Sequence, residues 1–133
     1  MTVADWLKES QLKLEQAGIT TARLDCSVLL EDATGKDRAW LLAHPEFALT
    51  NKQINELSTF INRRLQYEPL AYIRAKTEFY GREFTIDHRV LEPRPESEAI
   101  IDISKSICLD YDNPTIIDVG TGSGALAITA KLE

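Results

Sequence analysis

The sequence has few residues that bind metals or form disulfides. It contains two cysteines and two histidines among 133 residues. Cys26 and Cys108 lie far apart among apolar neighbours, and neither His44 nor His88 has another ligand at metal-binding spacing. We therefore expect buried, reduced thiols, as in a cytoplasmic protein, and no metal site.

A long hydrophobic run is also lacking. Spanning a bilayer takes about 18 consecutive apolar residues, and no stretch approaches that length. Asp5, Lys8 and Glu9 interrupt the first apolar residues, so we expect neither a membrane span nor a secretory leader. Basic residues are not in excess, because the formal net charge is −6. Direct nucleic-acid binding needs a clustered basic surface, so we expect proteins or small molecules as partners.

Residues 1–68 have the pattern of a small all-α helical bundle. Thr2 with Asp5, and Thr50 with Gln53, have the spacing of a capping box, in which two side chains bond the free N–H groups at a helix start. Apolar residues follow at helical spacing in four successive segments. We expect Pro69 to end the last helix, and we place the adjacent Arg63-Arg64 pair on its solvated face.

From Pro69 onward the pattern changes. Residues 77–80 and 83–86 flank Gly81-Arg82 and predict a β-hairpin with its turn at these two residues. Residues 69–92 are therefore expected to form a hairpin linker.

Residues 93–133 have the pattern that opens an α/β domain. Pro93-Arg94-Pro95 blocks regular structure, and Glu96 and Glu98 then suit the first turn of a helix, where acids favour the dipole. We expect an inward apolar stripe on this helix, formed by Ile100, Ile103 and Ile107. A short buried strand is expected at residues 115–119, and another helix at residues 125–132.

The segment joining this strand to this helix is the most informative one, and we call residues 118–124 the glycine loop. Asp118 precedes Gly120, Gly122 and Gly124, which alternate with Thr121 and Ser123. Glycine allows a sharp turn and lets a ligand approach the backbone with no Cβ in the way. The pattern indicates a loop that binds a nucleotide-type cofactor.

Several interpretations of this loop compete. A phosphate P-loop is excluded because no lysine follows Gly124. The dinucleotide pattern G-x-G-x-x-G/A is met formally by Gly120, Gly122 and Ala125. The pattern D-x-G-x-G-x-G of S-adenosylmethionine-dependent methyltransferases is met from Asp118 to Gly124, and its acid suits a cationic cofactor end. A purely structural glycine turn is the remaining alternative.

Four motifs in one order add a family resemblance. They are Glu68-Pro69-Leu70-Ala71-Tyr72-Ile73, Glu78-Phe79-Tyr80-Gly81-Arg82-Glu83-Phe84, Val90-Leu91-Glu92-Pro93-Arg94-Pro95-Glu96-Ser97-Glu98 and Asp118-Val119-Gly120-Thr121-Gly122-Ser123-Gly124. Together they resemble the release-factor glutamine methyltransferases, the HemK/PrmC family. The resemblance is specific from residue 68 onward and only architectural before it.

The resemblance implies a release-factor-binding helical bundle at residues 1–68 and a hairpin linker at residues 69–92. Residues 93–133 would begin a Rossmann-like α/β methyltransferase domain with its first βα unit. The implied reaction moves a methyl group from S-adenosylmethionine to the glutamine of the Gly-Gly-Gln loop of a peptide chain release factor. The implied cofactor-binding residues are Asp118, Gly120, Thr121, Gly122, Ser123 and Gly124. The protein is expected to be a monomer.

The Asn-Pro-Pro-Tyr motif with which the family holds the acceptor amide is absent from these residues. Asn113-Pro114 precedes the expected strand and lacks the second proline and the tyrosine. We therefore assign no catalytic residue, and we expect the isolated 133 residues to be inactive. Residues 115–133 are expected to be poorly anchored, or to pack differently from the intact enzyme, because one parallel strand cannot form a sheet. The alternatives are a non-catalytic release-factor-binding module and, further off, a dinucleotide-dependent oxidoreductase.

Three positions depart from the family pattern. Members usually have glycine at the position of Ala75, an apolar residue at Glu92 and threonine at Ser97. Ala75 would be strained if its position requires a positive φ.

Overall fold

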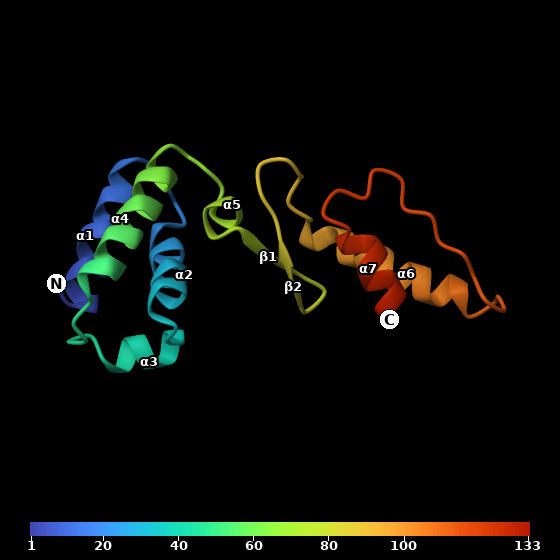
Figure 1. The fold of residues 1–133 in the computed structure, drawn as a ribbon, viewed down its shortest axis with the longest axis horizontal. Coiled ribbons are helices and arrows are strands. Elements are labelled where there is room, and N and C mark those ends of the chain that lie inside the picture. Colours follow the sequence, from blue (N-terminus) through green and yellow to red (C-terminus); the bar gives the residue numbers. More distant parts are fainter. The chain divides into compact units, whose positions relative to one another are not determined.

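The computed structural model of the chain describes residues 1–133, which divide into two compact units (Figure 1). The first unit is Met1–Arg74 and the second is Ala75–Glu133. None of the helices combines the length and the apolar character that crossing a membrane requires.

The first unit is entirely helical. Its helices are α1 (Val3–Gln16), α2 (Ala22–Thr34), α3 (Arg38–Ala43), α4 (Asn51–Leu65) and α5 (Leu70–Arg74). Both expected capping boxes form, with Thr2 and Asp5 at the start of α1 and Thr50 and Gln53 at the start of α4. Leucines and isoleucines from α1, α2 and α4 share one core with Trp6 and Cys26. The expected helical N-terminal domain is confirmed.

Helix α5 was not predicted. Pro69 stands before α5, and its carbonyl accepts hydrogen bonds from the N–H groups of Tyr72 and Ile73 at 3.1 and 3.2 Å. Proline is tolerated at a helix start because its missing N–H would have no partner there. The residue that was expected only to end one helix therefore also begins the next.

Arg63 and Arg64 do not lie on a solvated face, so that expectation was wrong. Arg64 donates through Nε to Asp25 Oδ2 on α2 at 2.7 Å, and the Asp25 side chain is only 5% exposed. Arg63 donates to the carbonyls of Tyr72 and Ile73 in α5 at 3.1 and 3.3 Å. The two guanidinium groups thus fasten α4 to α2 and to α5.

The second unit begins with an antiparallel hairpin of β1 (Lys76–Phe79) and β2 (Arg82–Thr85). Its turn lies one residue earlier than expected, because Phe79 pairs with Arg82 and leaves Tyr80 and Gly81 at the turn. Tyr80 has φ +52° and Gly81 has φ +70°, as a type I′ turn requires at both central residues. Ala75 has φ +57°, so the strain foreseen at this position is present.

Two helices complete the second unit after the short 3₁₀ turn η1 (Pro95–Ser97): α6 (Glu98–Cys108) and α7 (Ala125–Leu132). Ile101 is buried against Phe79, Phe84 and Ala125. The expected inward stripe was wrong, since the three isoleucines of that stripe are 50–59% exposed: Ile100, Ile103 and Ile107. The face of α6 that packs inward is the one that carries Ile101.

The expected strand at residues 115–119 is absent. The hairpin is the only sheet, and no backbone hydrogen bond joins residues 115–119 to the rest of the chain. Ile117 is 82% and Val119 is 91% exposed. A parallel strand needs a neighbour to satisfy its backbone groups, and no other strand lies beside this segment. By contrast, α7 is anchored, because Ala125 and Thr129 are buried.

Candidate functional site

The glycine loop, residues 118–124, keeps its tight backbone although the strand before it is not formed. Gly120, Gly122 and Gly124 have φ values of +80°, +58° and +80°. This left-handed region is costly for residues with a Cβ. A Cβ on Gly124 would also lie 3.1 Å from Ile128 Cδ1. Glycine is therefore favoured at this position chiefly by conformation, since a Cβ would need only a small shift of the Ile128 side chain.

Hydrogen bonds within the loop order its two ends. The Thr121 hydroxyl donates to Asp118 Oδ2 at 2.9 Å, and the Gly124 N–H donates to the Thr121 carbonyl at 2.9 Å. The N–H groups of residues 120–123 make no hydrogen bond within the chain. They lie just before the start of α7, where the helix dipole adds positive potential. The loop thus offers N–H groups without a partner in the chain beside the Asp118 carboxylate, of which only Oδ2 accepts a hydrogen bond.

A hollow of the second unit lies beside this loop. It has a volume of about 980 Å³ and is lined by α6, α7 and the segment 113–118. Asp118 is the one residue of the glycine loop that reaches it. The hollow therefore marks the space between the helices and the unpaired segment, and the glycines themselves lie outside it.

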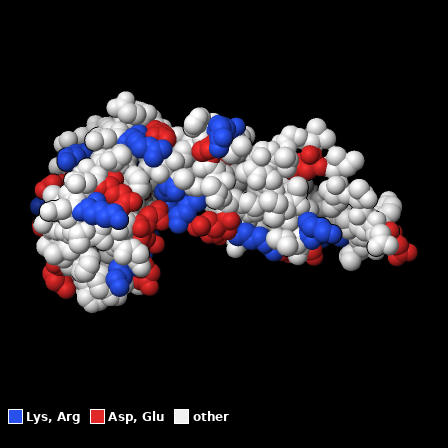
Figure 2. Space-filling model, viewed as in Figure 1, with Lys and Arg blue, Asp and Glu red and all other residues white.

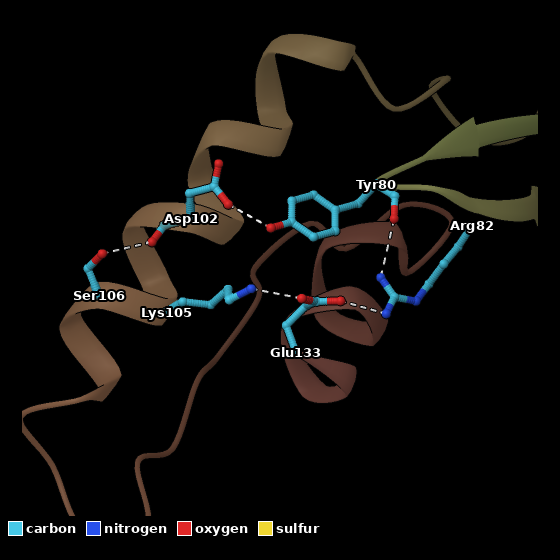
Figure 3. A network of polar contacts seen from close by, with 6 residues as sticks. All are labelled: Tyr80, Arg82, Asp102, Lys105, Ser106 and Glu133. Atoms are coloured by element: carbon cyan, nitrogen blue, oxygen red, sulfur yellow. Dashed lines mark hydrogen bonds and ion pairs between the residues drawn. The ribbon is translucent and has the colours of Figure 1, made fainter.

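A polar network that the sequence analysis missed connects the hairpin to both helices (Figure 3). Tyr80 Oη donates to Asp102 Oδ1 on α6 at 2.6 Å. Glu133, which follows α7, accepts from Arg82 Nη2 at 2.6 Å and from Lys105 Nζ at 2.8 Å. One signal was available in the sequence, because Glu98, Asp102 and Ser106 recur at intervals of four on one face of α6.

These contacts shift the acidity of the groups involved. The hydrogen bond to Asp102 raises the pKa of the Tyr80 phenol, because the carboxylate disfavours a second negative charge. Hydrogen bonds from Lys105 and Arg82 lower the pKa of Glu133. The hydrogen bond to Glu133 likewise raises the pKa of Lys105. All three groups are thus held in the charge state that the network needs near neutral pH.

Two acids of the segment Val90–Glu98, Glu92 and Glu98, make different contacts. Glu98 Oε1 accepts a hydrogen bond from the Tyr80 backbone N–H at 2.7 Å, so this acid holds the hairpin turn. Thr77 Oγ1 donates to Glu92 Oε1 at 3.3 Å. Glu92, which stands where the family usually has an apolar residue, thus has a polar partner. No group of three histidine, cysteine, aspartate or glutamate side chains is arranged to hold a metal ion.

Charged side chains of both signs are interspersed over the face drawn in Figure 2. Lysines and arginines often lie next to acids there. The chain's ion pairs include Arg74 with Asp32 and Lys76 with Glu83. No broad basic area is visible on this face.

Comparisons with known proteins agree on one family. Residues 5–74 match the family model described as "PrmC N-terminal domain". A release factor glutamine methyltransferase from Coxiella burnetii is 40% identical over 131 residues, which cover 96% of this chain and 47% of the relative. One from Chlorobaculum tepidum is 36% identical over 137 residues, which cover 99% of this chain and 47% of the relative. A bifunctional methyltransferase from Rickettsia bellii is 33% identical over 158 residues, covering 99% and 28%.

The chain spans about half the length of the release factor glutamine methyltransferases that it matches. The family match covers helices α1 to α5, which form the first compact unit. Because this match includes more than half of its residues, the chain belongs to the PrmC N-terminal domain family, as the resemblance in its sequence predicted.

Proposed function

We propose that the chain forms part of a release-factor glutamine methyltransferase that uses S-adenosylmethionine. Its first unit would recognise the release factor, and its second unit would supply the loop that binds the cofactor. The names of the relatives support the activity. The observation that carries the cofactor assignment is the geometry of the glycine loop.

The loop suits the amino-acid end of S-adenosylmethionine in three ways. The free N–H groups of residues 120–123 can donate to its carboxylate. The unused oxygen of Asp118 can accept from its ammonium group. The three glycines leave the backbone open to a close approach. We assign Asp118, Gly120, Thr121, Gly122, Ser123 and Gly124 to this site.

When bound, the cofactor supplies an electrophilic methyl group on a sulfonium. The acceptor amide is a poor nucleophile because its lone pair is delocalised, so transfer depends on close in-line placement and on acceptors for the amide hydrogens. The sequence contains no Asn-Pro-Pro-Tyr motif to provide those acceptors. We therefore propose that these residues hold the cofactor end but do not complete the catalytic site.

The second unit is proposed to begin a Rossmann-like domain from residue 93. The extended apolar segment at residues 115–119, the glycine loop and α7 have the order of its first βα unit. The unpaired backbone of this segment supports the proposal, because it is free to pair with strands that residues outside this chain supply.

Two measurements test the cofactor and the activity. Calorimetry on a longer form of the protein should detect binding of S-adenosylhomocysteine and none of NAD. Gly122→Ala should abolish this binding, whereas Gly35→Ala, at a left-handed helix end in the first unit, should retain it. Binding of NAD alone would replace the methyltransferase with the oxidoreductase alternative. In a methyl-transfer assay on purified release factor, the 133 residues should give no turnover.

A second candidate is a release-factor-binding module without catalysis. It is favoured by the self-contained core of the first unit and by an apolar groove of about 490 Å³ between α1 and the α3 region, lined in part by Leu12 and Leu42. In a pull-down with purified release factor, capture without methyl transfer supports this module. The variants Leu12→Glu and Leu42→Glu should then weaken capture, while Leu24→Glu on α2, equally exposed but outside the groove, should not.

A further inference from the structure

Helix α7 carries the glycine loop at its start, and a small buried side anchors it. It has eight residues, of which only Ala125 and Thr129 are buried. The segment before the loop makes no backbone hydrogen bond to the rest of the chain. Burial of Ala125 and Thr129, with Leu126 and Ala130 packed against the same cluster, fixes one side of this helix. Polar contacts at its far end can add to this anchoring.

The far end of α7 is held by one carboxylate with two cationic partners. Glu133 Oε1 accepts from Arg82 on β2 at 2.6 Å, and Oε2 accepts from Lys105 on α6 at 2.8 Å. The Glu133 side chain is 20% exposed, so it lies largely within the second unit. We call these three side chains the Glu133 bridge. Two different elements thus hold the two oxygens of one side chain.

Both cations of the bridge are themselves held in place. Arg82 also donates through Nη1 to the Tyr80 carbonyl at 3.3 Å, and Lys105 lies 5.7 Å from the centre of the Tyr80 ring. Tyr80 in turn is fixed to α6 by its phenol and by its N–H, through Asp102 and Glu98. Figure 3 shows the side chains of Tyr80 and Arg82 converging with α6 and the end of α7. Both cations of the bridge thus have a second contact at Tyr80.

We propose that Arg82, Lys105 and Glu133 are positioning residues for the glycine loop. A helix of this length is about 12 Å long, so contacts at its far end, together with the burial of Ala125 at its start, set the direction in which it presents the loop. The assignment of the loop to a cofactor rests on the proposed function. The positioning itself depends only on the contacts within the second unit.

The test uses glycine amide signals in nitrogen–proton correlation spectra of the 133-residue chain. Six glycines give few signals, which report separately on the first unit (Gly18, Gly35), the hairpin turn (Gly81) and the loop (Gly120, Gly122, Gly124). The variants are Glu133→Gln, which weakens both contacts, and Arg82→Met, which removes one. Arg89→Met is the matched control, because Arg89 pairs with Asp87 two residues away and its side chain is 78% exposed.

In Glu133→Gln and Arg82→Met the signals of the three loop glycines should shift or broaden, while those of Gly18 and Gly35 stay unchanged. The Ile128 amide, which donates to the Gly124 carbonyl at 2.8 Å, should exchange about two- to five-fold faster in Arg82→Met, and faster still in Glu133→Gln. Arg89→Met should change neither readout.

Unchanged loop signals in Glu133→Gln would overturn the proposal. So would rapid exchange of the Ile128 amide in the unaltered chain, because α7 would then not be held at all. Collapse of the Gly81 signal along with the loop signals in Glu133→Gln would also overturn it, since the bridge would then stabilise the whole unit and orient nothing. Arg82→Met is not used for this comparison, because Arg82 also donates to the Tyr80 carbonyl beside Gly81. Calorimetry with S-adenosylhomocysteine on the longer form of the protein separates the two ideas. Absence of binding there counts against the cofactor assignment and leaves the comparison of variants in the 133-residue chain intact.

Discussion

Replacing Ala75 by glycine should stabilise the second unit, although the same change usually destabilises a protein. Ala75 has φ +57°, and holding an L-residue in this region costs about 1–2 kcal/mol. Glycine removes that cost but gains freedom in the unfolded chain, which offsets about 0.4–1 kcal/mol. The Ala75 side chain is exposed, so no packing is lost. The free energy of unfolding should therefore rise by about 0.5–1 kcal/mol.

The assay is urea unfolding followed by two signals. Both tryptophans, Trp6 and Trp40, lie in the first unit, so their fluorescence reports on that unit alone. The Ala75 carbonyl accepts a hydrogen bond from the Ile86 N–H at 3.2 Å, within the second unit. We expect Ala75→Gly to raise the midpoint of the circular dichroism transition that tryptophan fluorescence does not follow, which belongs to the second unit, and to leave the fluorescence midpoint unchanged. If the slope of the free energy of unfolding against urea concentration is unchanged, the midpoints of the variants can be compared directly.

Ala39→Gly is the matched control. Ala39 is exposed within α3, where glycine is worse than alanine by about 1 kcal/mol. This variant should therefore lower the fluorescence midpoint. The reasoning is refuted if Ala75→Gly also destabilises the chain by a similar amount, because residue 75 would then not need the left-handed region.

Three further changes test other parts of the structure. Arg64→Met should cost the first unit about 3 kcal/mol in urea unfolding by fluorescence, because Asp25 keeps its buried charge without its partner. Thr129→Val should raise the stability of the second unit by about 1 kcal/mol in circular dichroism melts, since the buried Thr129 hydroxyl has no hydrogen-bond partner. Burial raises the pKa of the Cys26 thiol from 9.0 to about 12. Folding therefore disfavours the thiolate. The free energy of unfolding should keep its full value below pH 9 and fall as the pH rises toward 12. Urea midpoints measured at several pH values test this.

Each of these has a control of the same chemistry. Arg23 is exposed on α2, so Arg23→Met should change stability by less than about 0.5 kcal/mol. Thr129→Ser keeps the hydroxyl and should not stabilise. Cys26→Ala should flatten the fall in stability between pH 9 and 12. A small effect of Arg64→Met, or an equal alkaline fall in Cys26→Ala, would contradict the corresponding argument.

The helices of the first unit could be predicted because the residues that set their boundaries are close in sequence. The capping boxes join residues three apart, and Gly35 ends α2 through its own left-handed backbone at φ +66°. Arg64 could not be placed in this way, because its partner Asp25 lies 39 residues away. Sequence patterns predict hydrogen bonds between residues that are close along the chain. They do not show whether an arginine is solvated or pairs with a distant buried acid.

The hairpin illustrates a smaller failure of the same kind. Its strands were expected, but the turn was placed at Gly81-Arg82 because glycine is the usual residue at positive φ. In the structure Tyr80 also takes a positive φ, and Glu98 and Asp102 of α6 bond its backbone N–H and its phenol. These two acids lie about a helical turn apart, and only the packed helix brings both to one tyrosine. The turn was thus decided by contacts that no local preference encodes.

The two larger errors in the second unit, at α6 and at residues 115–119, have one physical origin. Both patterns assigned apolar side chains to a buried side, and the structure leaves them exposed, as Ile103 at 59% and Ile117 at 82% show. The two-stranded hairpin is the only sheet in the chain, and it is too small to cover them. Apolar surface of this extent usually marks a site where something else packs. The relatives are about twice as long as this chain, and we propose that the residues they add cover both surfaces at once. The patterns would then describe contacts of the longer protein, while the glycine loop, whose shape is set by its own backbone, forms without them.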